Sequence, residues 1–150
     1  MRINRRPRRA ATAVEFAMIA PAVILILLAL FIGGAGIFRY QELAHLTREA
    51  SRWAAVHGAD YARATNLPAA TAGDVYNQII VPNAAAINLG RLTYTVVWDT
   101  DNNPYRTEIV GGKVTRVNNT VTVTISYQWI PEAYLGGVSL GSASTSAMAF

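Results

Sequence analysis

An uncharged apolar run near the N-terminus constrains this chain more than any other feature. The run extends from Phe16 to Phe38 and holds 23 residues without a charge. A helix rises about 1.5 Å per residue, so the run can reach ~34 Å, which is enough to cross a hydrocarbon core about 30 Å thick. The sequence therefore predicts a helix that spans a membrane once.

The charges on either side of the run predict its orientation. Five arginines precede it, namely Arg2, Arg5, Arg6, Arg8 and Arg9. Only Arg39 and Arg48 follow it closely. Because basic flanks stay in the cytoplasm, we expect a cytoplasmic basic leader over residues 1–10, a transmembrane segment over 11–38 and an extracytoplasmic domain over 39–150.

The net charge of +4 comes from this leader. Without its five arginines, 8 basic residues stand against 9 acidic ones, which gives a net charge of −1. A protein that binds nucleic acid would carry its excess of Lys and Arg on the folded domain, where it could neutralise phosphates. We therefore expect no nucleic-acid partner. The absence of cysteine also excludes disulfides and zinc-thiolate sites.

One carboxylate, Glu15, stands at the edge of the apolar run. Taken alone, it is explained as an interfacial residue that the positive end of the helix dipole favours. In context, the stretch RRAATAVEFAMIAP over residues 8–21 resembles the start of the TadE-like minor pseudopilins of tight-adherence (Flp, type IVc) pilus systems. Residues 39–56 and 120–150 are also similar to that family.

The resemblance implies a maturation step. In the family a prepilin peptidase cuts after a small residue five positions before the glutamate, which here places the cut between Ala10 and Ala11. Glu15 and Phe16 would then serve peptidase recognition and subunit docking, with Glu15 paired to the new amine of Ala11 or of a neighbour. Ala10 departs from the glycine that usually precedes the cut.

The resemblance also implies a function and partners. The chain would assemble, prime or anchor an adhesive Flp-type pilus at the bacterial inner membrane, and either stay there or enter the fibre. Its partners would be the prepilin peptidase, other minor pseudopilins, the major Flp pilin and the inner-membrane platform of the pilus. No cofactor is implied.

Small residues near the end of the apolar run offer a surface for helix packing. Ala29, Gly33 and Gly36 would let another helix backbone approach closely in lipid. The alternative is the ordinary use of glycine in membrane helices. Both interpretations fit the sequence.

Residues 39–150 predict the rest of an α+β protein, in which the N-terminal transmembrane helix extends into a pilin-like domain with a small antiparallel sheet. One helical face is marked by apolar or aromatic residues at steps of three and four, namely Leu43, Leu46, Ala50, Trp53 and His57. Thr71 and Asp74 predict the start of a second helix, which Pro82 ends or interrupts. Residues 84–89 could add another turn.

The second half of the chain changes to the period of strands. Alternating β-branched and aromatic residues predict strands over 92–98 and 120–127, and residues 139–150 predict a last strand. Gly111-Gly112 predicts a tight hairpin between 107–110 and 113–117, and we prefer it to Asn118-Asn119 as the turn.

Neither an enzyme nor a strong metal site is predicted. The chain has two histidines, no cysteine and no G-x-S-x-G motif. Asp99, Asp101 and Asn103 have the alternate spacing that begins a calcium loop, but Pro104 and Val110 replace the glycine and glutamate that an EF-hand needs. A turn between strands explains these residues better.

Two other functions remain open from the sequence. The chain could be an uncleaved signal-anchored protein whose extracytoplasmic domain binds a ligand or calcium. Alternatively, cleavage after Gly36 would release a soluble domain, because Gly34-Ala35-Gly36 is a weak small-x-small site.

Overall fold

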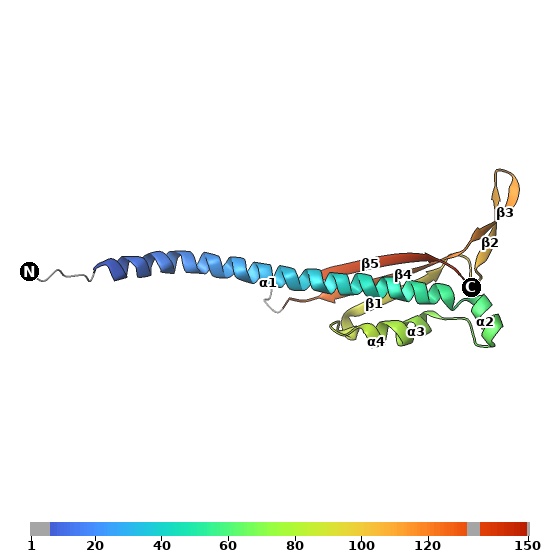
Figure 1. The fold of residues 1–150 in the computed structure, drawn as a ribbon, viewed down its shortest axis with the longest axis horizontal. Coiled ribbons are helices and arrows are strands. Elements are labelled where there is room, and N and C mark those ends of the chain that lie inside the picture. Colours follow the sequence, from blue (N-terminus) through green and yellow to red (C-terminus); the bar gives the residue numbers. More distant parts are fainter. Residues whose placement is uncertain (1–6, 132–135, 150) are drawn as a thin grey trace, which may run out of the picture. The chain divides into compact units, whose positions relative to one another are not determined.

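The computed structural model describes residues 7–131 and 136–149, with side chains from residue 11 onward. The chain divides into two compact units, Met1–Ile37 and Phe38–Phe150, and each is described by itself. Helix α1 (Pro7–Val56) begins in the first unit and ends in the second (Figure 1).

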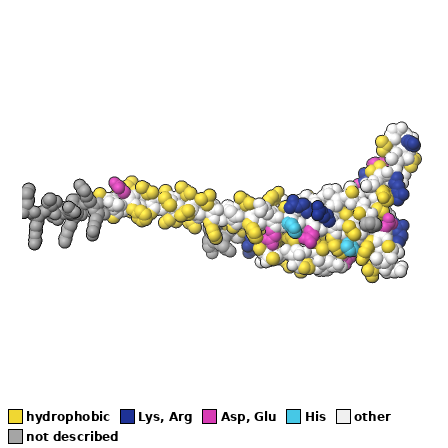
Figure 2. Space-filling model, viewed as in Figure 1, with side chains coloured by type: hydrophobic (Ala, Val, Ile, Leu, Met, Phe, Trp, Pro, Cys, Tyr) yellow, Lys and Arg dark blue, Asp and Glu magenta, His cyan; other side chains and the backbone are white. Residues whose placement is uncertain are grey.

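The first unit contains the apolar part of α1. Nearly all its described side chains are exposed, including Phe16 at 71% and Phe31 at 76%. Figure 2 shows one face of this helix covered with hydrophobic side chains. Among the residues that the structure describes, α1 is the one helix that is long and apolar enough to cross a membrane. Pro21 lies inside it, as a membrane helix tolerates.

The second unit is built on an antiparallel sheet of three strands. Its order is β1 (Leu92–Trp98), β4 (Thr120–Trp129) and β5 (Val138–Ala147), so β4 is central. In the register, Val123 lies opposite Val96 on one side and Ser144 on the other. A separate hairpin joins β2 (Tyr105–Val110) to β3 (Lys113–Asn118) and projects from the sheet in Figure 1.

Short helices complete the second unit. They are α2 (Ala59–Thr65), α3 (Ala72–Val75), the π-helical turn η1 (Tyr76–Ile80), α4 (Val81–Asn83) and the 3-10 turn η2 (Leu89–Arg91).

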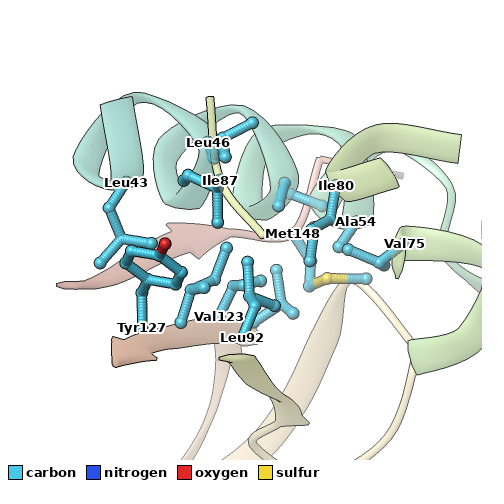
Figure 3. Close-up of a cluster of buried hydrophobic side chains, with 14 residues drawn as sticks. Leu43, Leu46, Ala54, Val75, Ile80, Ile87, Leu92, Val123, Tyr127 and Met148 are labelled. Atoms are coloured by element: carbon cyan, nitrogen blue, oxygen red, sulfur yellow. The ribbon is translucent and has the colours of Figure 1, made fainter. Parts of the chain in front are cut away.

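The core lies between the second half of α1 and one face of the sheet. Alternate residues of β4 are buried, namely Val121, Val123, Ile125 and Tyr127. The α1 residues Leu43, Leu46, Ala50 and Ala54 are buried in the same cluster. Figure 3 shows Ile80, Ile87 and Met148 within it. Burial of this apolar area from water is the main source of the domain's stability.

A polar contact joins α1 to β5. Ser51 is fully buried, and its hydroxyl lies 2.9 Å from the Ser144 hydroxyl and 3.0 Å from the Ser146 hydroxyl. Beyond β5, the Ala149 N–H donates to the Ala55 carbonyl over 3.1 Å. Helix α1 and the end of the chain are thus tied together by hydrogen bonds as well as by apolar packing.

The structure confirms the predicted α+β class and the strands predicted over 92–98 and 120–127. The last strand, predicted over 139–150, is β5 and ends at Ala147, and Phe150 lies outside the described residues. Residues 92–98 form β1, and 120–127 lie within β4. The hairpin turns at Gly111-Gly112, where both glycines have positive φ (61° and 80°), the conformation that a type I′ turn requires. Asn118-Asn119 instead links β3 to β4.

The short helices are where the sequence analysis was incomplete or wrong. Helix α2 was not predicted from the sequence. This helix is only 7 residues long and has no buried residue, so its apolar residues show no period that would mark a side facing the core. Residues 84–88 form no helix, and only η2 follows from Leu89. Pro82 ends the helix as predicted, one residue later at Asn83. The wider π turn η1 precedes it, because proline lacks an N–H and crowds the carbonyl four residues earlier.

The predicted capping box at Thr71 is confirmed. The Thr71 hydroxyl donates to Asp74 Oδ2 over 2.7 Å and accepts from the Asp74 N–H over 3.3 Å. The Thr71 N–H donates to the same carboxylate over 2.9 Å. The bond from the Thr71 hydroxyl has the largest effect and the bond from the Thr71 N–H the second largest. Both lower the pKa of the Asp74 carboxyl below its ordinary value.

This lowered pKa predicts a pH dependence. A depressed carboxyl pKa stabilises the fold above the pKa of the unfolded chain, and that stability is lost as the pH falls through the folded value. Below about pH 4 we therefore expect the thermal midpoint of the wild type to fall more steeply than that of Asp74→Asn, measured by circular dichroism. Thr71→Ser keeps the donor and should keep the wild-type pH dependence. If the thermal midpoints of wild type and Asp74→Asn fell equally as the pH is lowered, the lowered pKa of Asp74 would not be the cause of the pH dependence.

Candidate functional site

The residues of the predicted maturation site lie together at the start of α1. The backbone is helical at both Ala10 and Ala11, and Ala11 is exposed. Glu15 and Phe16 are exposed one turn further on. The Glu15 carboxylate has no ion-pair or hydrogen-bond partner among the residues that the structure describes, so it is open to a group from another chain.

The small residues predicted to pack helices lie farther along α1. Ala29 and Gly33 are exposed, and Gly36 is half-buried. A Cβ added at Gly33 would have no atom within 4 Å. The backbone at this position is therefore uncovered in the single chain.

The acidic residues of the calcium candidate contact protein groups. The Asp101 carboxylate accepts from the Asn103 N–H over 2.9 Å and from the Asn103 side-chain amide over 2.6 Å. The Asp99 carboxylate pairs with Arg106. No three or more His, Asp or Glu side chains gather to hold a metal in the described part of the chain. The alternate spacing of Asp99, Asp101 and Asn103 belongs to the turn that follows β1, which is the explanation preferred from the sequence.

One residue that the sequence analysis treated as a turn signal organises this loop. Asn119 is fully buried, and its amide donates to the carbonyls of Asp101 and Asn103 over 2.7 and 3.1 Å. Its backbone N–H donates to the Pro104 carbonyl, and its carbonyl accepts from the Met148 N–H, each over 2.8 Å. Asn119 therefore ties the loop after β1 to the end of the chain.

Both histidines make local contacts. The His57 ring stacks on Trp53 with centroids 4.0 Å apart, and its Nδ1 lies 2.9 Å from the Trp53 carbonyl. Because a carbonyl only accepts, Nδ1 carries the proton there. His45 lies on the exposed side of α1, with Nδ1 3.7 Å from the Glu49 carboxylate. The two histidines are thus held apart in separate contacts.

A cavity of about 430 Å³ was not foreseen from the sequence. It lies at the base of the β2–β3 hairpin, and three arginines line it, namely Arg63 of α2, Arg106 of β2 and Arg116 of β3. Arg106 and Arg116 lie on the two strands of one hairpin, but Arg63 comes from α2, so no local motif signals the whole site. Its lining holds more basic than acidic residues, and the net charge of the domain does not reveal this.

The comparisons with known proteins bear on the N-terminal segment. The family model described as TadE-like protein matches residues 10–52. No curated protein and no solved structure matches the chain. The matched segment contains Ala10, Ala11, Glu15 and Phe16, and it continues to the part of α1 that packs in the core. The match confirms the resemblance drawn from the motif around Glu15 and supports a part in tight-adherence pilus systems. Over residues 10–52, the chain is thus similar to the TadE-like family.

Proposed function

We propose that this protein is a minor pseudopilin that acts in the assembly, priming or anchoring of a tight-adherence pilus, after maturation by a prepilin peptidase. Its role is assembly rather than catalysis. It is anchored in the bacterial inner membrane, with residues 1–10 in the cytoplasm and the domain that follows α1's apolar part outside. The arginines of the leader support this orientation.

One observation carries the proposal: Glu15 is the only charged residue between Ala11 and Phe38, and it is exposed on an apolar helix. A charge at the centre of a membrane helix costs roughly 2.5 to 3.5 kcal/mol on insertion scales, and less near the interface. A chain that gained nothing from this carboxylate would be more stable in the membrane without it. Pairing with a cationic amine offsets part of the cost and favours contact with another subunit.

Cleavage before Ala11 supplies such an amine. The peptidase would break the Ala10–Ala11 bond and leave a cationic N-terminus four residues before Glu15. An amine on one subunit and a carboxylate on the next can then pair within the bilayer, where neither is well solvated. The exposed surface at Ala29 and Gly33 supports close packing of neighbouring helices in the same assembly.

The first test is the intact mass of the protein purified from membranes of its native host, with a peptide map of its N-terminus. We expect the chain to begin at Ala11. A start at Met1 would oppose maturation by the peptidase and favour a signal anchor. A start near Ile37 would oppose the pseudopilin proposal as a whole, because the membrane helix would be lost.

A matched variant sharpens this measurement. Ala10→Gly restores the residue that usually precedes the cut in the family, and glycine removes the Cβ from the position next to the scissile bond. We expect this variant to be processed at least as completely as the wild type. Loss of processing in Ala10→Gly would contradict a cut at this bond.

A further inference from the structure

The cavity at the base of the β2–β3 hairpin lies outside the segment that matches the TadE-like family. Its volume, about 430 Å³, is within the range of roughly 300 to 1,000 Å³ that is typical of small-molecule sites. Besides Arg63, Arg106 and Arg116, its polar lining includes Asp60 and Asn103. Tyr105, Pro104 and Val114 add apolar surface.

Two of the three arginines are paired with carboxylates. Arg63 pairs with Asp60 and also donates to Asn103 Oδ1 over 3.3 Å. Arg106 pairs with Asp99, and its other terminal nitrogen lies 3.6 Å from Glu108. These pairs hold donors and acceptors side by side around the cavity. The carboxylates use only part of their acceptor capacity on the arginines.

Arg116 is different, because no carboxylate pairs with it in the described part of the chain. Its guanidinium carbon lies 3.8 Å from the centroid of the Tyr105 ring. Stacking occupies one face of the guanidinium, and the N–H groups at its edge remain available to a ligand. A stacked guanidinium is also held in place before the ligand arrives, which lowers the entropic cost of binding.

Basic side chains line the cavity at this end of the domain. Residues 39–150 carry 8 basic and 8 acidic residues, yet the cavity is lined by three arginines and one carboxylate, Asp60. Lys113, at the turn of the hairpin, lies outside the lining. Figure 2 shows dark blue side chains on the hairpin and below it. Asp60, Asp99 and Glu108 neutralise Arg63 and Arg106. The preference for an anionic group therefore comes from Arg116, whose charge no carboxylate among the described residues neutralises.

We infer that this cavity binds an acidic saccharide of the uronic acid type. The sugar carboxylate binds the edge of the Arg116 guanidinium, and sugar hydroxyls bind Asp60, Asn103 and Arg63. The apolar faces of the sugar ring lie against Tyr105, Pro104 and Val114. A phosphate fits less well, because it offers fewer hydroxyl donors to Asp60 than a sugar does and would bring up to two negative charges close to that carboxylate. The inference does not depend on whether the chain enters a pilus.

The experiment is a calorimetric titration of the full-length protein in nanodiscs with trigalacturonate. We expect saturable binding that weakens with added salt, since the ligand carboxylates and Arg116 attract each other through solvent. Maltotriose, which is neutral, should bind much more weakly. Absence of trigalacturonate binding at millimolar concentration, or equal binding of maltotriose, would overturn the inference.

Two variants of the hairpin identify the site. Arg116→Gln should lower the affinity for trigalacturonate by about tenfold or more, because it removes a charge-assisted bond. Lys113→Gln loses the same charge on the same strand outside the cavity lining, and it should bind nearly as the wild type does. Arg63→Gln, on α2, should also weaken binding, and circular dichroism would verify that each variant folds.

Three outcomes of these variants would overturn the site. The first is an equal loss in Lys113→Gln and Arg116→Gln, which would mean general electrostatic attraction. The second is unchanged binding in both Arg116→Gln and Arg63→Gln. The third is displacement of trigalacturonate by stoichiometric inorganic phosphate, which would assign the cavity to phosphate rather than to a saccharide.

Discussion

Replacing Glu15 with glutamine is expected to abolish co-isolation of this protein with other pilus components while leaving it in the membrane. The substitution removes one negative charge and keeps the size of the side chain. Insertion should be unimpaired or easier, because the apolar run from Phe16 to Phe38 is unchanged and the segment from Ala11 to Phe38 loses its only charge. Docking should be lost, because a neutral amide cannot neutralise the amine of a neighbouring subunit.

The measurement is affinity purification from solubilised membranes, followed by mass spectrometry of what accompanies the chain. Glu49→Gln is the matched control, since it makes the same change on α1 within the Phe38–Phe150 unit. It should co-isolate its partners as the wild type does. Unchanged co-isolation of Glu15→Gln would mean that this carboxylate has no part in docking, even if the N-terminus begins at Ala11.

Replacing Asn119 with alanine is expected to lower the free energy of unfolding of the Phe38–Phe150 unit by about 3 kcal/mol. Asn119 is fully buried, and alanine leaves the carbonyls of Asp101 and Asn103 without their donor. The Thr120 N–H also loses the Asn119 side-chain oxygen, 3.1 Å away. A fully buried polar group that is left unpaired costs about 1 to 3 kcal/mol. These hydrogen bonds are only partly buried, so water can replace some of them and the sum stays near the lower end of that range for each group.

Urea unfolding followed by tryptophan fluorescence would measure this loss. Asn118→Ala is the control, because Asn118 is the same residue type one position earlier but is exposed at the end of β3. It should change the free energy of unfolding by no more than about 0.5 kcal/mol. Equal losses in the two variants would show that the buried hydrogen bonds of Asn119 are not what stabilises the loop.

Local sequence was enough to predict most of the sheet. The alternation at Val121, Val123 and Ile125 becomes the buried face of β4, because successive side chains of a strand point to opposite faces. The turn at Gly111-Gly112 follows from the need for positive φ at two consecutive positions. The face of α1 that includes Leu43 and Leu46 likewise packs in the core as its period predicts.

Local sequence was not enough where a residue's role depends on distant partners. Asn119 stands next to Asn118 in a pair that resembles a turn signal, yet its hydrogen bonds reach Asp101 and Asn103, 18 and 16 residues earlier. The short helix α2 carries no buried residue, so it has no apolar period to detect. The same holds for the cavity at the hairpin, whose arginines are ordinary surface residues when each is considered alone.

The sequence by itself determined the membrane-length helix, the motif around Glu15 and the pattern of strands. These features depend on the order and spacing of residues within one segment, and hydrophobic burial acts on them segment by segment. Only the tertiary structure decided that Asn119 is a buried support and that Arg63, Arg106 and Arg116 share a cavity. Such sites exist only when the chain brings distant segments together, because hydrogen bonds and charges interact over a few ångströms of space and not along the sequence.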